Sequence, residues 1–146
     1  MLLLTGATGF LGAAFYLDAV ARGQGADCLL LIRGENEDAC RARLFRQLSR
    51  FVDDRAAKDY AGLCRILPGD LLSLSATDDA RLDAVREIVH VAADTSFESR
   101  SNVWRVNVDG TLALARRAQP RAGEQAEESG GDRGQRRQDA LGVPHL

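Results

Sequence analysis

Three glycines, Gly6, Gly9 and Gly12, follow a short apolar run at the start of the chain and restrict the folds open to it. Residues 1–5 are apolar as far as Leu4, which is typical of a buried strand. The segment 5–12 reads TGATGFLG, and residues 10–22 then carry apolar side chains at helical spacings until Gly23. The order of these segments predicts a strand, a tight turn and a helix.

Each glycine suits a different part of such a turn. Gly6 permits the tight turn, Gly9 lets backbone N–H groups approach a pyrophosphate, and Gly12 lets the helix pack closely on the strand. The helix N-terminus adds a partial positive charge. We therefore expect this segment to bind a dinucleotide, and a plain connecting loop is the alternative.

Further apolar runs predict strands at 28–32, 64–67 and 87–92, separated by helical patterns. The alternation of strands and helices predicts a parallel sheet of the α/β class. Right-handed crossovers then give the strand order 3-2-1-4. The expected fold is an incomplete Rossmann-type, doubly wound α/β sheet.

Three helices are expected after the second strand. Asn36 is expected to cap a helix whose first turn carries Glu37 and Asp38. Its buried stripe is Cys40, Leu44, Leu48 and Phe51 or Val52. A short helix is expected from Asp78 or Asp79 to Val85, and a longer one over 102–118. The expected apolar face of the longer helix is Trp104, Val108, Thr111, Leu112 and Ala115.

The last part of the chain differs in character. Residues 119–138 contain no aromatic residue and no aliphatic residue larger than alanine, while Gly, Glu, Gln and Arg dominate. Such a segment lacks the apolar surface to pack into a core. We therefore expect a nucleotide-binding domain over 1–118, a disordered polar tail over 119–146, and no fifth strand.

The end of the second strand indicates which dinucleotide is bound. An NAD enzyme usually places Asp or Glu there, whereas this chain has Arg33. An arginine suits the 2′-phosphate of NADP(H) through bidentate, charge-assisted hydrogen bonds. Arg43 on the following helix is a second candidate. A solvated surface charge is the alternative for both arginines.

Other candidates follow the third and fourth strands. Asp70 is expected to accept a hydrogen bond from the adenine amine, with Leu71 against the ring; an Asp that caps the turn is the alternative. His90 is expected to make a structural hydrogen bond rather than act as a base. Asn107, polar in an amphipathic helix, needs partners if buried, so a structural role is open there too.

Composition excludes several classes of function. A net charge of −2 gives no electrostatic case for nucleic acid or an acidic membrane as a partner. The opening apolar run is too short to span a membrane, so we expect a cytoplasmic protein. Cys28, Cys40 and Cys64 form no CxxC pair and are expected to be buried or half-buried thiols rather than metal ligands.

The motifs together resemble the extended short-chain dehydrogenase/reductase superfamily. The closest likeness is to its acyl-thioester reductases, which include fatty acyl-CoA reductases and the terminal reductase domains of carboxylic acid reductases and peptide synthetases. The resemblance covers residues 1 to about 118. It rests on TGATGFLG at 5–12, LLLIRG at 29–34, PGDL at 68–71, HVAADTSF at 90–97 and NVDGT at 107–111.

This resemblance implies roles for individual residues. Those implied to hold the pyrophosphate are Gly6, Thr8, Gly9, Phe10 and Leu11, with Gly12 in the same turn. Arg33 and Arg43 would hold the 2′-phosphate, and Asp70 and Leu71 the adenine. Ala92 and Ala93 would lie against the cofactor, and Asn107 would match a proton-relay asparagine. The implied reaction is hydride transfer from NADPH to an acyl thioester on a carrier protein or coenzyme A.

The chain departs from the family at its catalytic motif. The resemblance implies a Tyr-x-x-x-Lys pair that protonates the carbonyl oxygen. The only lysine is Lys58, with Asp54 four residues before it, and neither Tyr16 nor Tyr60 has a lysine four residues on. We therefore expect no catalytic residue here, with Asn107 as a relay remnant.

Several interpretations of this departure stay open. The change of composition at Gln119 favours a truncated or frame-shifted reductase that is inactive alone. The alternatives are a non-catalytic NADP-binding or sensing module, an epimerase- or dehydratase-like protein, and a component completed by a separate chain.

Overall fold

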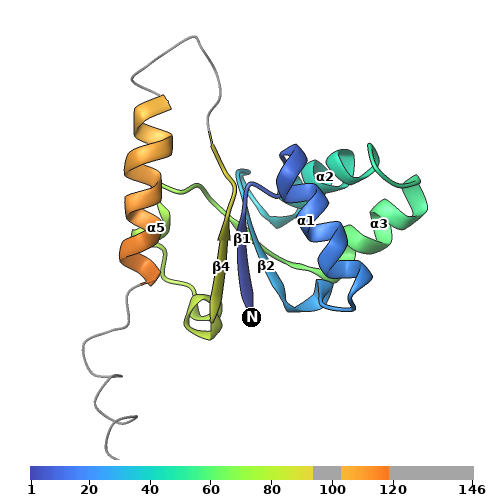
Figure 1. The fold of residues 1–146 in the computed structure, drawn as a ribbon, viewed down its shortest axis with the longest axis horizontal. Coiled ribbons are helices and arrows are strands. Elements are labelled where there is room, and N and C mark those ends of the chain that lie inside the picture. Colours follow the sequence, from blue (N-terminus) through green and yellow to red (C-terminus); the bar gives the residue numbers. More distant parts are fainter. Residues whose placement is uncertain (94–102, 119–146) are drawn as a thin grey trace, which may run out of the picture.

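The computed structural model describes residues 1–93 and 103–118, which form a sheet between two layers of helices (Figure 1). The expected tail over 119–146 lies outside the described residues. The strands are β1 (Leu2–Thr5), β2 (Cys28–Ile32), β3 (Arg65–Pro68) and β4 (Glu87–His90). One face of the sheet is covered by α1 (Phe10–Ala21), α2 (Glu37–Leu48) and α3 (Asp54–Leu63), and the other by α5 (Gly110–Ala118). None of the described helices is long and apolar enough to cross a membrane.

The sheet is parallel with the order β3-β2-β1-β4, which confirms the predicted topology. Leu3 of β1 pairs with Leu29 of β2 and with Ile88 of β4, and Leu30 pairs with Ile66 of β3. All four strands therefore end at one edge of the sheet. Strand β3 is shifted by one residue from the expected 64–67, and β4 ends at His90, two residues earlier than expected.

Alternating strand residues build a separate core on each face of the sheet, as the period of two along a strand requires. One core lies under α1, α2 and α3; its strand residues are Leu4, Cys28, Leu30, Ile32 and Ile66. The other lies under α5; its strand residues are Leu3, Leu29, Leu31 and Leu67. All five residues of β2 are buried, which explains its unbroken apolar run.

Helix α1 begins where the glycine spacing predicted it and buries mainly small residues against the sheet. The buried residues are Gly12, Ala13, Tyr16 and Ala19, whereas Phe10 and Leu11 are exposed. The small residues let the helix lie close to the sheet. Tyr16 completes this contact, since its hydroxyl donates to the carbonyl oxygen of Tyr60 at 2.7 Å.

Two helices, rather than one, connect β2 to β3. The first, α2, has the expected cap: Asn36 accepts a hydrogen bond from the N–H of Ala39 at 2.9 Å. The second, α3, was not predicted. Asp53 caps it by accepting from the N–H of Ala56 at 2.9 Å, and its buried face is only Ala57 and Ala61. Such small residues give little apolar pattern to read in the sequence.

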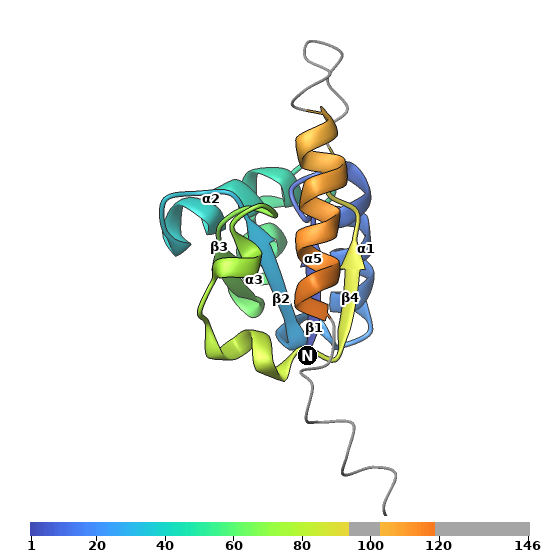
Figure 2. The same cartoon turned by 90° about the vertical axis from the view of Figure 1, so that its left-hand side faces the viewer.

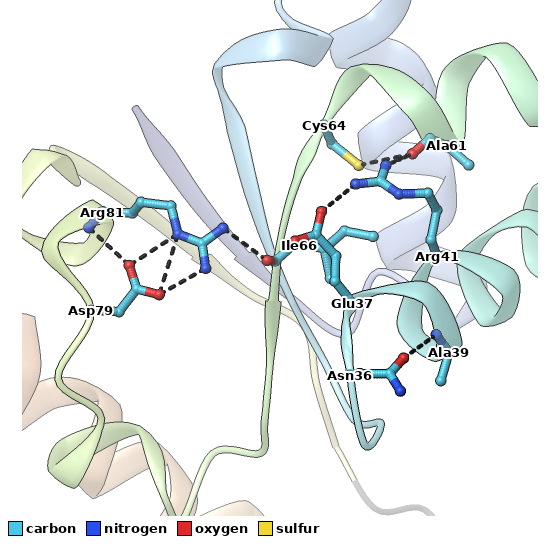
Figure 3. A network of polar contacts seen from close by, with 9 residues as sticks. All are labelled: Asn36, Glu37, Ala39, Arg41, Ala61, Cys64, Ile66, Asp79 and Arg81. Atoms are coloured by element: carbon cyan, nitrogen blue, oxygen red, sulfur yellow. Dashed lines mark hydrogen bonds and ion pairs between the residues drawn. The ribbon is translucent and has the colours of Figure 1, made fainter.

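Arg41 ties these two helices together. Its guanidinium forms an ion pair with Glu37 of α2 at 2.5 Å and donates to the carbonyl oxygen of Ala61 in α3, to which the Cys64 thiol also donates (Figure 3). All three cysteines are free and buried, which confirms the predicted thiols. Burial raises the pKa of each thiol.

After β3 the chain turns through two 3-10 helices, η2 (Leu74–Ala76) and η3 (Ala80–Ala84), the second replacing the short helix expected near Asp79. Arg81 pairs with Asp79 at 2.7 Å, and its other nitrogen donates to the carbonyl oxygen of Ile66 at 3.0 Å (Figure 3). The hydrogen bonds from Arg81 lower the pKa of Asp79 to about 2. The Arg81–Asp79 pair thus supplies a hydrogen bond to a backbone carbonyl oxygen of the outer strand β3.

The last described helix differs most from expectation. After the α-helical residues 103–104 it passes through a π-helical turn, η4 (Arg105–Asp109), and continues as α5, which crosses the sheet in front of β1 (Figure 2). Its buried residues are Gly110, Ala113 and Leu114, while Trp104 and Leu112 are exposed. The predicted apolar face was therefore wrong. A π turn closes over five residues instead of four, so spacings counted at 3.6 residues per turn lose phase across it.

Candidate functional site

A cleft of about 670 Å³ opens at the edge of the sheet where the strands end. Each strand contributes its last residue or the residues just beyond it, so the cleft lies where open α/β sheets usually bind ligands. The lining residues are Thr5, Gly6, Thr8, Gly9, Leu31, Ile32, Arg33, Arg43, Gly69, Asp70, Leu71, Leu72, Val91, Ala92, Ala93, Arg105 and Val106.

Most residues predicted from the sequence meet in this one cleft. Those that line it are Gly6, Thr8, Gly9, Arg33, Arg43, Asp70, Leu71, Ala92 and Ala93. Four others do not: Phe10, Leu11, Gly12 and Asn107. Phe10 and Leu11 are the first residues of α1, where the backbone N–H groups have no partner within the helix. Their exposed side chains point to a backbone role.

The three glycines have the distinct surroundings that their spacing predicted. Gly6 has φ +80°, and a Cβ there would lie 2.6 Å from the N atom of Ala92. At Gly12 a Cβ would lie 2.1 Å from the carbonyl oxygen of Gly6, which confirms its predicted packing role. Gly9 is different, since only the Gly6 oxygen, at 3.3 Å, is within 4 Å of a Cβ built there. The space beside the Gly9 backbone, where a Cβ would lie, is therefore largely open.

Helix α1 has no side chain at its N-terminus to cap it. Gly9 occupies the N-cap position and makes no side-chain hydrogen bond. The first turn also carries no acidic residue. The unpaired N–H groups and the positive end of the helix dipole are therefore left for an anion.

Arg33 and Arg43 lie together at the end of β2. The Arg43 guanidinium donates to the backbone carbonyl oxygen of Arg33 at 3.3 Å, which holds it beside the first arginine. No acidic residue from this strand end lines the cleft among the residues described. The end of β2 therefore has the positive charge and the hydrogen-bond donors that a phosphate requires.

Asp70 caps its own turn and also lines the cleft. One carboxylate oxygen accepts a hydrogen bond from the N–H of Ser73 at 2.8 Å, and the Ser73 hydroxyl donates to the Asp70 carbonyl at 3.1 Å. These hydrogen bonds confirm that Asp70 caps its turn. The contact with Ser73 uses only one of the two carboxylate oxygens of Asp70.

His90 joins three elements through hydrogen bonds, which confirms its predicted structural role. Its Nδ1 lies 2.6 Å from the Thr5 hydroxyl, and its Nε2 lies 3.0 Å from the Thr111 hydroxyl. Thr111 donates its proton to the carbonyl oxygen of Asn107 at 2.6 Å. The imidazole therefore donates from Nε2 and accepts at Nδ1, as a neutral ring does. Burial lowers the pKa of His90, which favours this neutral form.

The same chain of bonds reaches the cleft at both ends. The N–H of Ala92 donates to the Thr5 hydroxyl at 3.4 Å, and Ala92 lines the cleft. At the other end, Asn107 belongs to η4, whose first residues Arg105 and Val106 also line it. Asn107 itself is half-buried beside the cleft. The network thus sets how β4 and η4 meet at the site.

Arg105 and Val106 were missed by sequence reasoning. Consecutive side chains of a regular helix point about 100° apart around its axis, so a regular helix gives no reason to place both on one wall of the cleft. The π turn changes the angle between successive side chains. The only signal in the sequence was their position just before Asn107.

None of the tyrosines or lysines among the described residues lines the cleft. Tyr16 is fully buried in the core, and burial raises the pKa of its hydroxyl, which is opposite to what proton transfer at neutral pH needs. Lys58 lies on α3. The described residues contain no cluster of three or more His, Cys, Asp or Glu placed to hold a metal ion.

Comparison with known proteins places this chain in a family. Residues 4–126 match the model of an NAD-binding family described as male sterility protein. No curated protein matches the chain. Among solved structures, the terminal R domain from the myxalamid PKS-NRPS biosynthetic pathway is 26% identical, with a TM-score of 0.64 over 80% of this chain and 31% of that one.

Other solved structures are similar to the same degree. The reductase domain of a non-ribosomal peptide synthetase from Mycobacterium tuberculosis is 30% identical, with a TM-score of 0.63 over 80% of this chain and 29% of that one. A thiolation-reductase di-domain from an archaeal non-ribosomal peptide synthetase is 25% identical, with a TM-score of 0.64 over 80% and 31%.

The chain spans about a third of the length of these reductase structures. The match to the family model covers most of the chain, and the structural neighbours are reductase domains of the type that its motifs resemble. The chain therefore belongs to the male sterility protein family of NAD-binding domains, in the thioester-reductase branch of the extended short-chain dehydrogenases/reductases.

Proposed function

We propose that this chain binds NADP(H) in the cleft at the end of the sheet and serves as the nucleotide-binding part of a thioester reductase. The observation that carries the proposal is the pairing of an uncapped glycine turn at Gly9 with Arg33 and Arg43 in one cleft. The uncapped glycine turn suits a pyrophosphate, and the two arginines suit a 2′-phosphate. Their joint presence favours NADP(H) over NAD(H).

The fit of such a molecule follows from the surroundings of the glycines. The open side of Gly9 leaves room for a pyrophosphate against the start of α1, where the N–H groups of Phe10 and Leu11 would bind it. Arg33 and Arg43 would hold the 2′-phosphate. Asp70 keeps one carboxylate oxygen for the adenine amine, and Leu71 lies beside it in the lining.

In the parent activity the bound nucleotide would supply a hydride to an acyl thioester carried by a carrier protein or coenzyme A. The residues of this chain would bind and orient the nucleotide. Ala92 and Ala93 would let it lie close to the end of β4, and Asn107 would take part in a proton relay. The chain holds no Tyr-x-x-x-Lys pair to protonate the carbonyl oxygen, so we expect binding without turnover.

Titration of the chain with NADPH and NADH tests the cofactor. We expect NADPH to bind at least about tenfold more tightly, since a charge-assisted bond to a phosphate contributes about 1.5–3 kcal/mol. Arg33→Gln should remove most of this preference and leave NADH affinity nearly unchanged. Arg46→Gln, on the same helix as Arg43 but outside the cleft lining, is the matched control. Equal affinity for the two nucleotides would contradict the assignment.

Catalysis is tested separately by following NADPH oxidation with an acyl-CoA. We expect no turnover by this chain, because its sequence has no Tyr-x-x-x-Lys pair and no tyrosine or lysine among the described residues lines the cleft. Measurable oxidation above the rate without protein would overturn the view that binding and catalysis are separated here.

A further inference from the structure

Arg105 is a charged residue of the cleft that neither the glycine turn nor the end of β2 accounts for. It is the first residue of the π turn η4, which continues into α5 on one face of the sheet. Arg43 belongs to α2, which covers the opposite face (Figure 1). The two arginines therefore reach the cleft from opposite walls.

The side chain of Arg105 is free to bind a ligand. Other arginines of the chain have carboxylate partners: Arg22 pairs with Asp18 at 2.7 Å, and Arg81 pairs with Asp79. The Arg105 guanidinium has no hydrogen bond or ion pair with residues 1–93 or 103–118, the part of the chain that the structure describes. Asp70, the one carboxylate that the described residues contribute to the lining, is bound to the N–H of Ser73.

The backbone that carries Arg105 is held firmly on two sides. Its carbonyl oxygen accepts the N–H of Gly110 across the π turn. Gly110 packs so closely on the β3 loop that an added Cβ would lie 3.0 Å from the Cβ of Leu71. The next residue, Thr111, is bound to His90 of β4. These contacts fix the start of η4 at the rim of the cleft.

We infer that Arg105 binds a phosphate of the molecule that occupies the cleft, other than the 2′-phosphate, from the wall opposite Arg43. Among the described residues, three arginines against one carboxylate give the lining a net positive charge, and a guanidinium matches a phosphate through two parallel hydrogen bonds. The inference rests on the proposed function. The phosphate has two candidate sources: the pyrophosphate of the dinucleotide, or the phosphopantetheine phosphate of a thioester substrate entering the same cleft.

Binding of three ligands to the full chain distinguishes these sources. NADPH carries the pyrophosphate and the 2′-phosphate, adenosine 2′-monophosphate carries only the latter, and 4′-phosphopantetheine carries its own phosphate without a pyrophosphate. The test variant is Arg105→Gln. The matched control is Arg116→Gln, which removes the same charge from an exposed position of α5 outside the cleft lining.

For the pyrophosphate source, Arg105→Gln should weaken NADPH binding about tenfold and leave adenosine 2′-monophosphate binding unchanged. For the phosphopantetheine source, NADPH binding stays unchanged and 4′-phosphopantetheine binding falls instead. Arg105→Lys should lose part of the affinity, since it keeps the charge without the planar fork. Arg116→Gln should bind every ligand as the native chain does.

Three results would overturn the inference. Native affinity of Arg105→Gln for both NADPH and 4′-phosphopantetheine would show that the guanidinium binds neither of these phosphates. A matching loss for adenosine 2′-monophosphate would place Arg105 on the 2′-phosphate, with Arg43. A native chain that binds none of the ligands would remove the proposed function as well, so the two failures are distinguishable. Unchanged circular dichroism spectra of the variants exclude misfolding as the cause.

Discussion

At the scale of single residues, the contact between Gly12 and Gly6 determines how closely α1 approaches the end of β1. The atoms nearest to a Cβ at Gly12 are the carbonyl oxygen of Gly6 at 2.1 Å and its carbonyl carbon at 2.5 Å. Both belong to the backbone and cannot rotate away. The spacing of the glycines predicted this packing, because few other local patterns require a glycine three residues into a helix.

Replacement of Gly12 by alanine should therefore destabilise the fold. We expect the free energy of unfolding to fall by at least about 2 kcal/mol, because overpacking against backbone atoms forces α1 to move. Gly62 is the matched control: it also lies in a helix, α3, but has no atom within 4 Å of an added Cβ. Gly62→Ala should raise the free energy of unfolding by about 0.5 kcal/mol.

Urea denaturation of both variants measures the difference. If Gly12→Ala kept the native midpoint, the close approach of α1 to the glycine turn would be refuted. A loss of stability in Gly62→Ala equal to that in Gly12→Ala would show that the effect belongs to any helical glycine and not to this contact.

At the scale of elements, the His90 network holds β1, β4 and η4 in one arrangement. The sequence predicted that His90 makes a structural hydrogen bond, but not with which partners. Thr5 lies 85 positions away along the chain and Thr111 lies 21 away. Only the fold brings these three side chains together. The same holds for the π turn between Trp104 and Leu112, two residues that were expected on the apolar face and are exposed.

The neutral state of His90 predicts a pH dependence of stability. The pKa of His90 is lowered in the folded chain, while the unfolded chain has the ordinary value near 6.5. Between these values the unfolded state binds more protons, so the stability from neutral His90 is present above about pH 6.5 and lost as pH falls through the folded pKa. We expect the free energy of unfolding to fall between pH 7.5 and pH 5.

His90→Gln isolates this contribution, since glutamine keeps polar atoms but does not titrate. The variant should be less stable than the native chain at pH 7.5, and its free energy of unfolding should change less over the same pH range. An identical pH dependence in both chains would mean that another group is responsible. The pKa of Asp79, about 2, places that carboxyl outside the tested range.

At the scale of the whole molecule, the two layers of helices do not cover the sheet equally. Three helices pack on one face, while α5 packs alone on the other (Figures 1 and 2). In the described residues β4 is the outermost strand beside β1, and no strand pairs with its other edge. Nearby apolar side chains are exposed: Val91 by 37%, Leu112 by 49% and Trp104 by 65%. An open strand beside apolar surface favours association.

We expect the isolated chain to self-associate as its concentration rises, through β4 and the exposed side of α5. Leu112→Glu should raise the concentration needed for association, because it places a charge on this surface. Leu63→Glu is the matched control: Leu63 is 48% exposed but lies on α3, on the other face of the sheet. It should associate as the native chain does.

Sedimentation velocity at increasing concentration measures association, and the single tryptophan offers a second readout. Trp104 fluorescence should shift to shorter wavelength as its indole leaves water. A chain that stays monomeric at high concentration contradicts the prediction. Equal effects of Leu112→Glu and Leu63→Glu would place the contact elsewhere.

The sequence by itself determined the strands, their parallel order, the roles of Gly6 and Gly12, and the gathering of Arg33, Arg43 and Asp70 at one edge. These features depend on local patterns: apolar runs, glycine spacing and the rule that parallel strands end together. The tertiary structure alone decided the partners of His90, the second helix before β3, and the place of Arg105 in the cleft. Those depend on contacts between distant segments and on a π turn, whose phase no periodicity along the chain reveals.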